Sequence, residues 1–344
     1  MGAATKRGNF WSRMSDEDLL DLRFCDLGLT IKGTDLERRI DVLYQQLDKR
    51  GLRFRPHFWL GEEWFSPEGV PGIAIPFYLA HPRLTKLEYR QMFEVEGGTH
   101  RSCMQLLRHE TGHAIEAAYR LERRKRWKTV FGDPRKPYPD YYTPRPNSKR
   151  YVLNLDWWYA QSHPHEDFAE TFAVWLGSHA GWRKQYHDWP ALKKLEYLDE
   201  LMQSVGQVSP RVRCRKQVEP ISRIRRTLRE HYAEKREHYE IKVPEVYDED
   251  LYQLFRDPAS GQDGKQSAAS WLRRNKVELC QVCARGTGEH PYTFAQILQE
   301  LIIRGREMGL CIKRPLDEVK IDTAIYLSVK ALNHLYNTRH RIPV

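Results

Sequence analysis

Long apolar runs are missing from this chain. No stretch of the 344 residues approaches the roughly 18 consecutive apolar residues that a transmembrane helix needs. The N-terminal segment MGAATKRGNFW has no apolar signal-peptide region, and Lys6 stands where a myristoylation signal requires Ser or Thr. We therefore expect no membrane partner and a cytoplasmic location.

Cysteine is also scarce, with six in the whole chain, too few for a disulfide scaffold of this length. Only Cys280 and Cys283 form a CxxC pair, and no second pair is present to complete a zinc ribbon. Both lie in the helix-like run KVELCQVCA, where positions i and i+3 share one face. We interpret them as buried structural residues rather than metal ligands.

The composition is that of a globular protein, with 40% hydrophobic and 12% aromatic residues, and the length favours two domains. Strand-like and helical patterns are mixed up to Val205, whereas later segments are mostly helical, with a flexible link at DPASGQDGKQS (257–267). We therefore predict an α+β domain over residues 1–205 and a basic, mostly helical region of unknown role over 206–344.

Hydrophobic periodicity and turn residues predict the elements of both regions. In the first we expect helices over 15–23, 34–51, from 98 or 100 onward, and 165–176; strands over 24–31, 52–61 and 72–82; and a long basic loop over 123–150. In the second we expect helices in the basic segment within residues 212–240 and over 267–284, 292–309 and 321–337.

The formal net charge is +10, and most of the surplus lies after residue 205. Its densest part, VRCRK (212–216) followed by ISRIRRTLREHYAEKREHYE (221–240), could bind nucleic-acid phosphates. Glu230, Glu234 and Glu237 are interleaved with the Arg and Lys residues, which favours a solvated helix face with i,i+4 ion pairs. Nucleic acid is therefore an open but less favoured partner.

The segment LLRHETGHAIEAAYR (106–120) places ionisable groups in an otherwise apolar helical stretch. His109, Glu110 and His113 form the pattern HExxH. Residues four apart on a helix differ by about 40° in azimuth and roughly 6 Å in rise, so both imidazoles can reach one Zn²⁺. Glu110 cannot bind the same ion, but it projects toward the position of a metal-bound water, where a general base is needed.

Glu110 also falls inside the apolar sector of this helix, where an uncompensated carboxylate costs several kcal/mol of desolvation. Gly112 lowers helix propensity by about 1 kcal/mol, which indicates a close approach at that turn. HExxH also occurs by chance, so a third ligand is needed to distinguish a metal site from coincidence.

The segment YAQSHPHEDFAETFAVWL (159–176) supplies a candidate third ligand. Glu166 and Glu170 lie four apart on one flank of a predicted helix. On its own, such a glutamate pair is typical of the solvent-exposed face of a surface helix. Beside HExxH, we predict that Glu166 completes a His–His–Glu zinc site with one position left for water, and that Glu170 hydrogen-bonds a ligating histidine and fixes its tautomer.

The two motifs, LLRHETGH and YVLNLDWWYAQSHPHEDFAETFAVWL, resemble the family named putative zinc-binding metallopeptidases, a gluzincin type with a glutamate third ligand. The second segment is also similar to the catalytic domain of the anthrax lethal factor family. That resemblance implies a catalytic role for Tyr159, seven residues before Glu166. Asp167, where the second family has an aromatic residue, agrees with the first family. The resemblance covers roughly residues 15–205 and implies a zincin-like fold.

These features predict a zinc-dependent metallopeptidase that acts on a protein or peptide substrate and holds one Zn²⁺. The ion activates a water, Glu110 serves as general base, and the ion together with Tyr159 stabilises the oxyanion. Tyr159 is alternatively a core residue, and His163 or His165 either assists the oxyanion or has a structural role.

The substrate is expected to lie extended along the strand GIAIPFYLA, whose alternative role is a buried strand, while the basic loop 123–150 would favour acidic segments. Two other functions stay open: a nucleic-acid-associated protein, and a scaffold with a structural zinc site. The sequence does not determine the oligomeric state.

Overall fold

The computed structural model describes residues 9–143, 145, 148–177, 181–239, 248–256, 266–336 and 342–343. The described chain forms two compact units. The first contains the described residues up to Leu87, the segment Val95–Glu230 and Pro343. The second contains Glu88–Glu94 and the described residues from His231 to Ile342. The sequence places the division after residue 205, whereas the described residues between 206 and 230 lie with the first unit.

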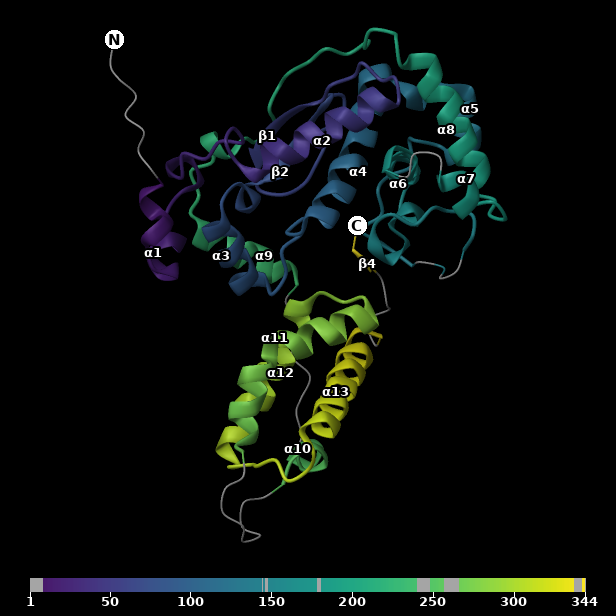
Figure 1. Ribbon diagram of the computed structural model, residues 1–344. Helices are drawn as coiled ribbons and strands as arrows, with labels where there is room; N and C mark the ends of the chain where they lie inside the picture. The colour runs from purple at the N-terminus through teal and green to yellow at the C-terminus, as the bar shows by residue number, and fades with distance from the viewer. Residues whose placement is uncertain are drawn as a thin grey trace, which may run out of the picture. The chain divides into compact units, whose positions relative to one another are not determined.

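The first unit combines helices with a small sheet (Figure 1). Its α-helices are α1 (Asp16–Leu20), α2 (Asp35–Lys49), α4 (His100–Tyr119), α5 (Lys125–Phe131), α6 (Pro164–Gly177), α7 (Gly181–Gln185) and α8 (Leu192–Val205). Its 3-10 helices are η1 (Phe10–Arg13), η2 (Phe24–Asp26), η3 (Phe77–Ala80), η4 (Leu121–Arg123), η5 (Asp156–Gln161) and η6 (Ile221–Arg223). The helices α3 (Pro82–Met92) and α9 (Leu228–His238) begin in this unit and end in the second.

The strands are β1 (His57–Gly61), β2 (Gly72–Pro76), β3 (Tyr141–Tyr142) and β4 (Ile342–Pro343). β1 and β2 pair in parallel, with His57 opposite Gly72 and Gly61 opposite Pro76. Phe65 makes an antiparallel bridge to Ala74 on β2, where the Ala74 amide donates to the Phe65 carbonyl at 2.9 Å. Every residue of β2 is buried. The expectation that this strand offers a free edge is therefore wrong at its centre, and its alternative role as a buried strand is observed.

Three of the predicted elements differ from the structure. The strand predicted over 72–82 ends at Pro76, and the 3-10 helix η3 follows it. The segment 24–31 is not a strand: Phe24 and Leu27 are both buried, a spacing of three that suits the 3-10 helix η2, and Gly28 follows with φ +61°. The predicted loop over 123–150 contains α5, which buries Trp127 and Phe131 four residues apart. Its many Arg and Lys residues hide this short apolar stripe from a periodicity search.

Local interactions at Thr99 and Arg120 define the two ends of α4, the helix that carries HExxH. Thr99 caps α4: its hydroxyl accepts from the Ser102 amide, and the Ser102 hydroxyl accepts from the Thr99 amide. The helix ends at Arg120, which is left-handed with φ 52°. α4 lies against α6, and an alanine Cβ at Gly112 would stand 2.7 Å from the Ala169 Cα. Only glycine therefore allows the two helices to approach this closely, as the sequence indicated.

We expect Gly112→Ala to destabilise the first unit by about 1–3 kcal/mol, because the backbone of α6 must move to admit the new methyl group. The free energy of unfolding in urea measures this change. Gly305→Ala in α12 (Pro291–Glu307) is the matched control, since a Cβ there meets nothing within 4 Å. That variant should gain up to about 1 kcal/mol from helix propensity. A Gly112→Ala protein as stable as wild type would contradict the close packing.

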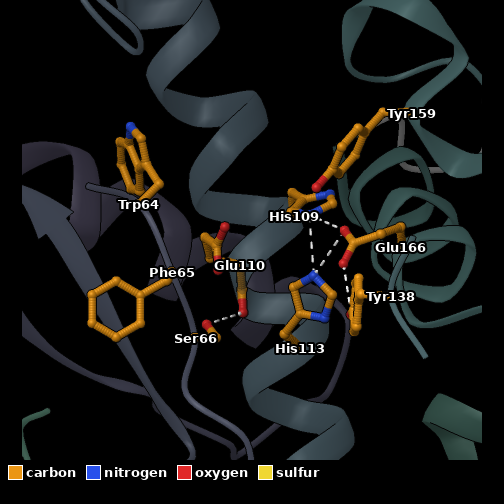
Figure 2. Close-up of a pocket in the computed structure, with 9 residues that line it drawn as sticks. All are labelled: Trp64, Phe65, Ser66, His109, Glu110, His113, Tyr138, Tyr159 and Glu166. Atoms are coloured by element: carbon orange, nitrogen blue, oxygen red, sulfur yellow. Dashed lines mark hydrogen bonds and ion pairs between the residues drawn. The ribbon is translucent and has the colours of Figure 1, made fainter. Parts of the chain in front are cut away.

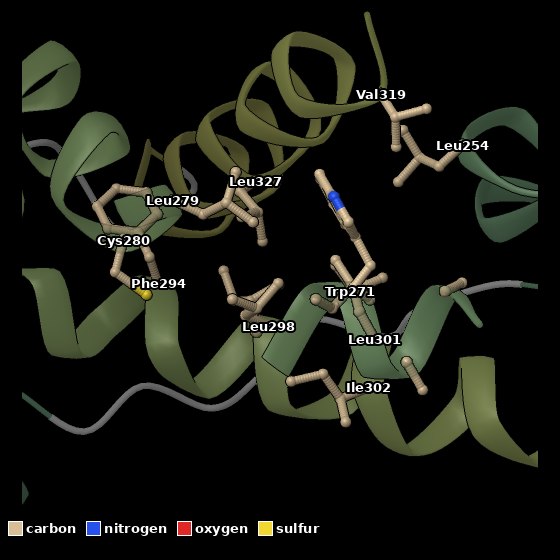
Figure 3. Close-up of a cluster of buried hydrophobic side chains, with 14 of the residues drawn as sticks. Leu254, Trp271, Leu279, Cys280, Phe294, Leu298, Leu301, Ile302, Val319 and Leu327 are labelled. Atoms are coloured by element: carbon tan, nitrogen blue, oxygen red, sulfur yellow. The ribbon is translucent and has the colours of Figure 1, made fainter. Parts of the chain in front are cut away.

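The second unit is helical, with α10 (Asp248–Leu254), α11 (Ala268–Thr287), α12 and α13 (Leu316–Tyr336). Figure 3 shows Trp271, Leu298 and Leu327 among the side chains that fill its core. Cys280 and Cys283 are both buried in this core and are not joined in a disulfide, in line with a structural role. The predicted link at 257–267 lies almost entirely outside the described residues.

The chain as described is a mixture of many helices and a small parallel sheet, consistent with the α+β class. In the basic segment only α9 is an α-helix, and the residues from 207 to 219 have no helix. None of the described helices combines the length and apolar character needed to cross a membrane.

Candidate metal centre

Two neighbouring helices bring three potential metal ligands together (Figure 2). His109 and His113 lie one turn apart in the middle of α4, and Glu166 lies in the first turn of α6. Glu166 Oε2 is 3.0 Å from His109 Nε2 and 3.2 Å from His113 Nε2. The ligand atoms of all three residues lie within 4.8 Å of one another, so the group could hold a metal ion.

The donor set fits zinc. The Nε2 atoms of His109 and His113 are 3.1 Å apart and face the same carboxylate oxygen. If both rings are neutral with their protons on Nδ1, two nitrogen lone pairs point at one spot, an arrangement that a shared cation stabilises. Two imidazoles and a carboxylate are a typical zinc ligand set that leaves a fourth position open. His109 is 3% exposed and Glu166 4%, so the spot is shielded from bulk water.

The histidines and the glutamate of the trio shift one another's pKa values in opposite directions. Burial alone would lower the pKa of His109, but hydrogen bonds to Glu166 and Glu170 raise that pKa well above its ordinary value. Burial would raise the pKa of Glu166, yet His113 and His109 hold it well below its ordinary value. The site thus favours positive charge beside a carboxylate, and a divalent cation would take the place of imidazole protons.

Glu170, one turn after Glu166, orients His109. Its carboxylate accepts hydrogen bonds from His109 Nδ1 at 2.8 Å, Asn154 Nδ2 at 2.8 Å and the Leu155 amide at 2.9 Å. With the proton on Nδ1, the Nε2 lone pair of His109 is left for an ion. This is the contact with a ligating histidine that the sequence predicts for Glu170.

Glu110 lines the same cavity as the trio, and among the described residues its side chain has no hydrogen bond or ion pair to them. Its side chain is buried, and Oε2 has no hydrogen-bond partner among the described residues. Its main-chain carbonyl accepts from the Ser66 hydroxyl at 3.0 Å, which ties α4 to the segment after β1. A buried carboxylate oxygen without a partner is costly unless a water or substrate group meets it. Glu110 is therefore placed to receive a proton.

The three candidate ligands and Glu110 line one cavity of about 200 Å³. Its lining consists of Trp64, Phe65, Ser66, His109, Glu110, His113, Tyr138, Tyr159 and Glu166. The volume corresponds to several waters at about 30 Å³ each, which suits an ion, a water and a peptide unit rather than a large cofactor. Figure 2 shows the α4 residues between Trp64, Phe65 and Ser66 on one side and Tyr138, Tyr159 and Glu166 on the other.

Four of the lining residues were not identified from the sequence: Trp64, Phe65, Ser66 and Tyr138. Tyr138 is in contact with a candidate ligand, since its hydroxyl donates to Glu166 Oε1 at 2.8 Å. It lies in the Pro- and Tyr-rich stretch before α6, where no spacing relates it to either motif.

Tyr159 and the two nearby histidines differ in their access to the cavity. Tyr159 lines it, with its ring centroid 5.7 Å from that of His109. His163 donates through Nε2 to the Lys136 carbonyl at 2.9 Å and accepts the His165 amide on Nδ1 at 3.2 Å. His165 pairs through Nδ1 with Glu116 at 2.8 Å. Neither histidine lines the cavity, so of the two roles left open for them the structural one agrees with the geometry.

Comparison with known families bears directly on this site. Residues 84–182 match the model of a family described as "Putative zinc-binding metallo-peptidase". Over that segment, the chain resembles a zinc-binding metallopeptidase. The matched segment contains α4 and α6, and with them the His109, His113 and Glu166 group. No curated protein and no solved structure gave a significant match. The family match therefore supports zinc binding and, at a coarse level, hydrolysis of peptide bonds.

Proposed function

We propose that the chain is a zinc-dependent endopeptidase of the gluzincin type, with a zincin-like first unit and one zinc ion. The observation that carries this proposal is the convergence of His109, His113 and Glu166 beside the unpartnered carboxylate oxygen of Glu110. A structural zinc site requires the three ligands but gives no reason for a second carboxylate, Glu110, in the same cavity. The family match over residues 84–182 supports the same function.

In this proposal His109, His113 and Glu166 hold the ion, and Glu170 keeps His109 in the required tautomer. When bound, zinc would supply Lewis acidity and lower the pKa of its water toward neutrality. Glu110 accepts the proton of the attacking water through Oε2 and later returns it to the leaving amine.

The side of the cavity that contains Tyr159 would bind the substrate carbonyl. Burial, and after it the nearby Glu166 carboxylate, raise the pKa of Tyr159, so its hydroxyl stays protonated at neutral pH. It therefore serves as a hydrogen-bond donor to the oxyanion of the tetrahedral intermediate. An extended peptide would pass between Tyr159 and the segment Trp64–Ser66, which lies on the opposite side of α4 (Figure 2). This assigns substrate binding to the segment beside β2 rather than to β2 itself.

The basic region gives little support to a nucleic-acid function. Arg226 pairs with Glu62, Arg229 with Glu17 and Asp21, and Lys235 with Glu88. These three cations are engaged by carboxylates of other segments and are less available to phosphates. The cytoplasmic location stays a prediction.

Peptide cleavage and its dependence on metal test the proposed function. The purified chain should cleave members of a peptide library, with products identified by mass spectrometry. Removal of the metal with a chelator should abolish cleavage, and one equivalent of zinc should restore it. A chain that keeps stoichiometric zinc yet cleaves neither peptides nor unfolded proteins would instead support the structural scaffold.

A further inference from the structure

The two carboxylate oxygens of Glu166 have different environments. Oε2 faces the Nε2 atoms of His109 and His113, at 3.0 and 3.2 Å. Oε1 accepts a hydrogen bond from the Tyr138 hydroxyl at 2.8 Å. Because the two oxygens have different partners, we propose that Tyr138 is a positioning residue. It holds Glu166 so that only one carboxylate oxygen, Oε2, is available to the metal. The inference rests on the proposed function, because it concerns the third ligand of that site.

Tyr138 is held in place from the side away from the ion. Its ring stacks on His163, with centroids 3.9 Å apart and planes inclined by 20°. His163 is itself fixed by its bonds to the Lys136 carbonyl and the His165 amide. The stack therefore joins the segment that carries Tyr138 to the start of α6, two residues before Glu166.

The exposure of Tyr138 argues that this contact is specific. The residue is 51% exposed, yet its hydroxyl is turned inward to a carboxylate that is almost fully buried. A tyrosine with that much access to solvent could bond its hydroxyl to water at no cost. In this contact the phenol O–H is the donor, because an ionised carboxylate can only accept.

The physical consequence concerns the number of positions left for water and substrate. A carboxylate with two free oxygens can bind a divalent ion through both of them. A hydrogen bond to Oε1 withdraws that oxygen and orients the other, which keeps a coordination position open for water. Loss of the tyrosine hydroxyl would also leave Oε1 buried without a donor.

Zinc affinity of the full-length protein tests this role without reference to activity. We expect Tyr138→Phe to bind zinc about 10–100-fold more weakly than wild type, in competition with a chromophoric chelator, since partners of metal ligands have effects of this size. In protein loaded with Co²⁺, the variant should lose visible absorption intensity as the coordination number rises from four toward five.

Tyr44→Phe is the matched control. The Tyr44 hydroxyl also donates a 2.8 Å hydrogen bond, to the Pro56 carbonyl, and it does not contact the metal ligands. Its zinc affinity should equal that of wild type. Equal affinities for Tyr138→Phe and wild type, or equal losses in both variants, would overturn the positioning role. A wild-type chain that binds no zinc would instead refute the proposed function itself, so the two failures are distinguishable.

Discussion

Glu110→Gln is expected to lower kcat for peptide cleavage by about 10²–10⁴-fold, the usual contribution of a general acid–base group. Glutamine has nearly the same size but cannot accept a proton. Glu110 lines the cavity, and among the described residues no hydrogen bond or ion pair joins its side chain to the three candidate ligands. The substitution should therefore leave the zinc content unchanged and remove only proton transfer.

Steady-state kinetics and metal analysis on the same preparation measure both effects. Glu116→Gln provides the control: Glu116 is also a buried glutamate of α4, but it pairs with His165 and does not line the cavity. Its kcat should stay within a few-fold of wild type. Wild-type turnover in Glu110→Gln would assign the proton transfer to another group and remove the basis for our reading of the HExxH pattern.

The two helices of the site could be predicted from the sequence because each has a local hydrophobic periodicity. α4 and α6 have apolar stripes that a 3.6-residue period detects, and HExxH defines which flank of α4 bears the imidazoles. That His109, His113 and Glu166 converge follows from the close packing at Gly112. The sequence indicated such an approach at Gly112 without naming Ala169 as the partner.

The rest of the cavity is set by tertiary contacts that leave no local pattern. Tyr138 comes from an irregular segment that tertiary contacts attach beside α6: the bond from His163 to the Lys136 carbonyl, the bond from Tyr138 to Glu166 and the stack of Tyr138 on His163. Trp64 and Phe65 follow a short strand and are placed by the bridge to Ala74. None of these contacts has a characteristic sequence spacing, so periodicity could not predict these residues.

Composition also gives no sign that residues 206–230 lie with the first unit. The residues after 205 are basic and lack the alternation of a strand. The amides of Arg211 and Val212 nevertheless donate to the Ala118 carbonyl, and the Trp59 indole donates to the Val218 carbonyl. In each of these bonds the segment takes part through its main chain, and main-chain donors and acceptors are largely independent of side-chain composition.

Glu166→Ala should have the largest effect on metal binding. It removes one of three protein donors and leaves only two imidazoles on α4. The Tyr138 hydroxyl would also lose its acceptor, so the loss of affinity should exceed the 10–100-fold typical of an outer partner. Glu196→Ala on α8, an exposed position, is the control and should bind zinc as wild type does.

Zinc content after gel filtration therefore tests the account most directly. Elemental analysis should find one zinc ion per chain in wild type and in Glu196→Ala, and none retained in Glu166→Ala. Stoichiometric zinc in Glu166→Ala would contradict the account, because the ion would then have a ligand set other than His109, His113 and Glu166.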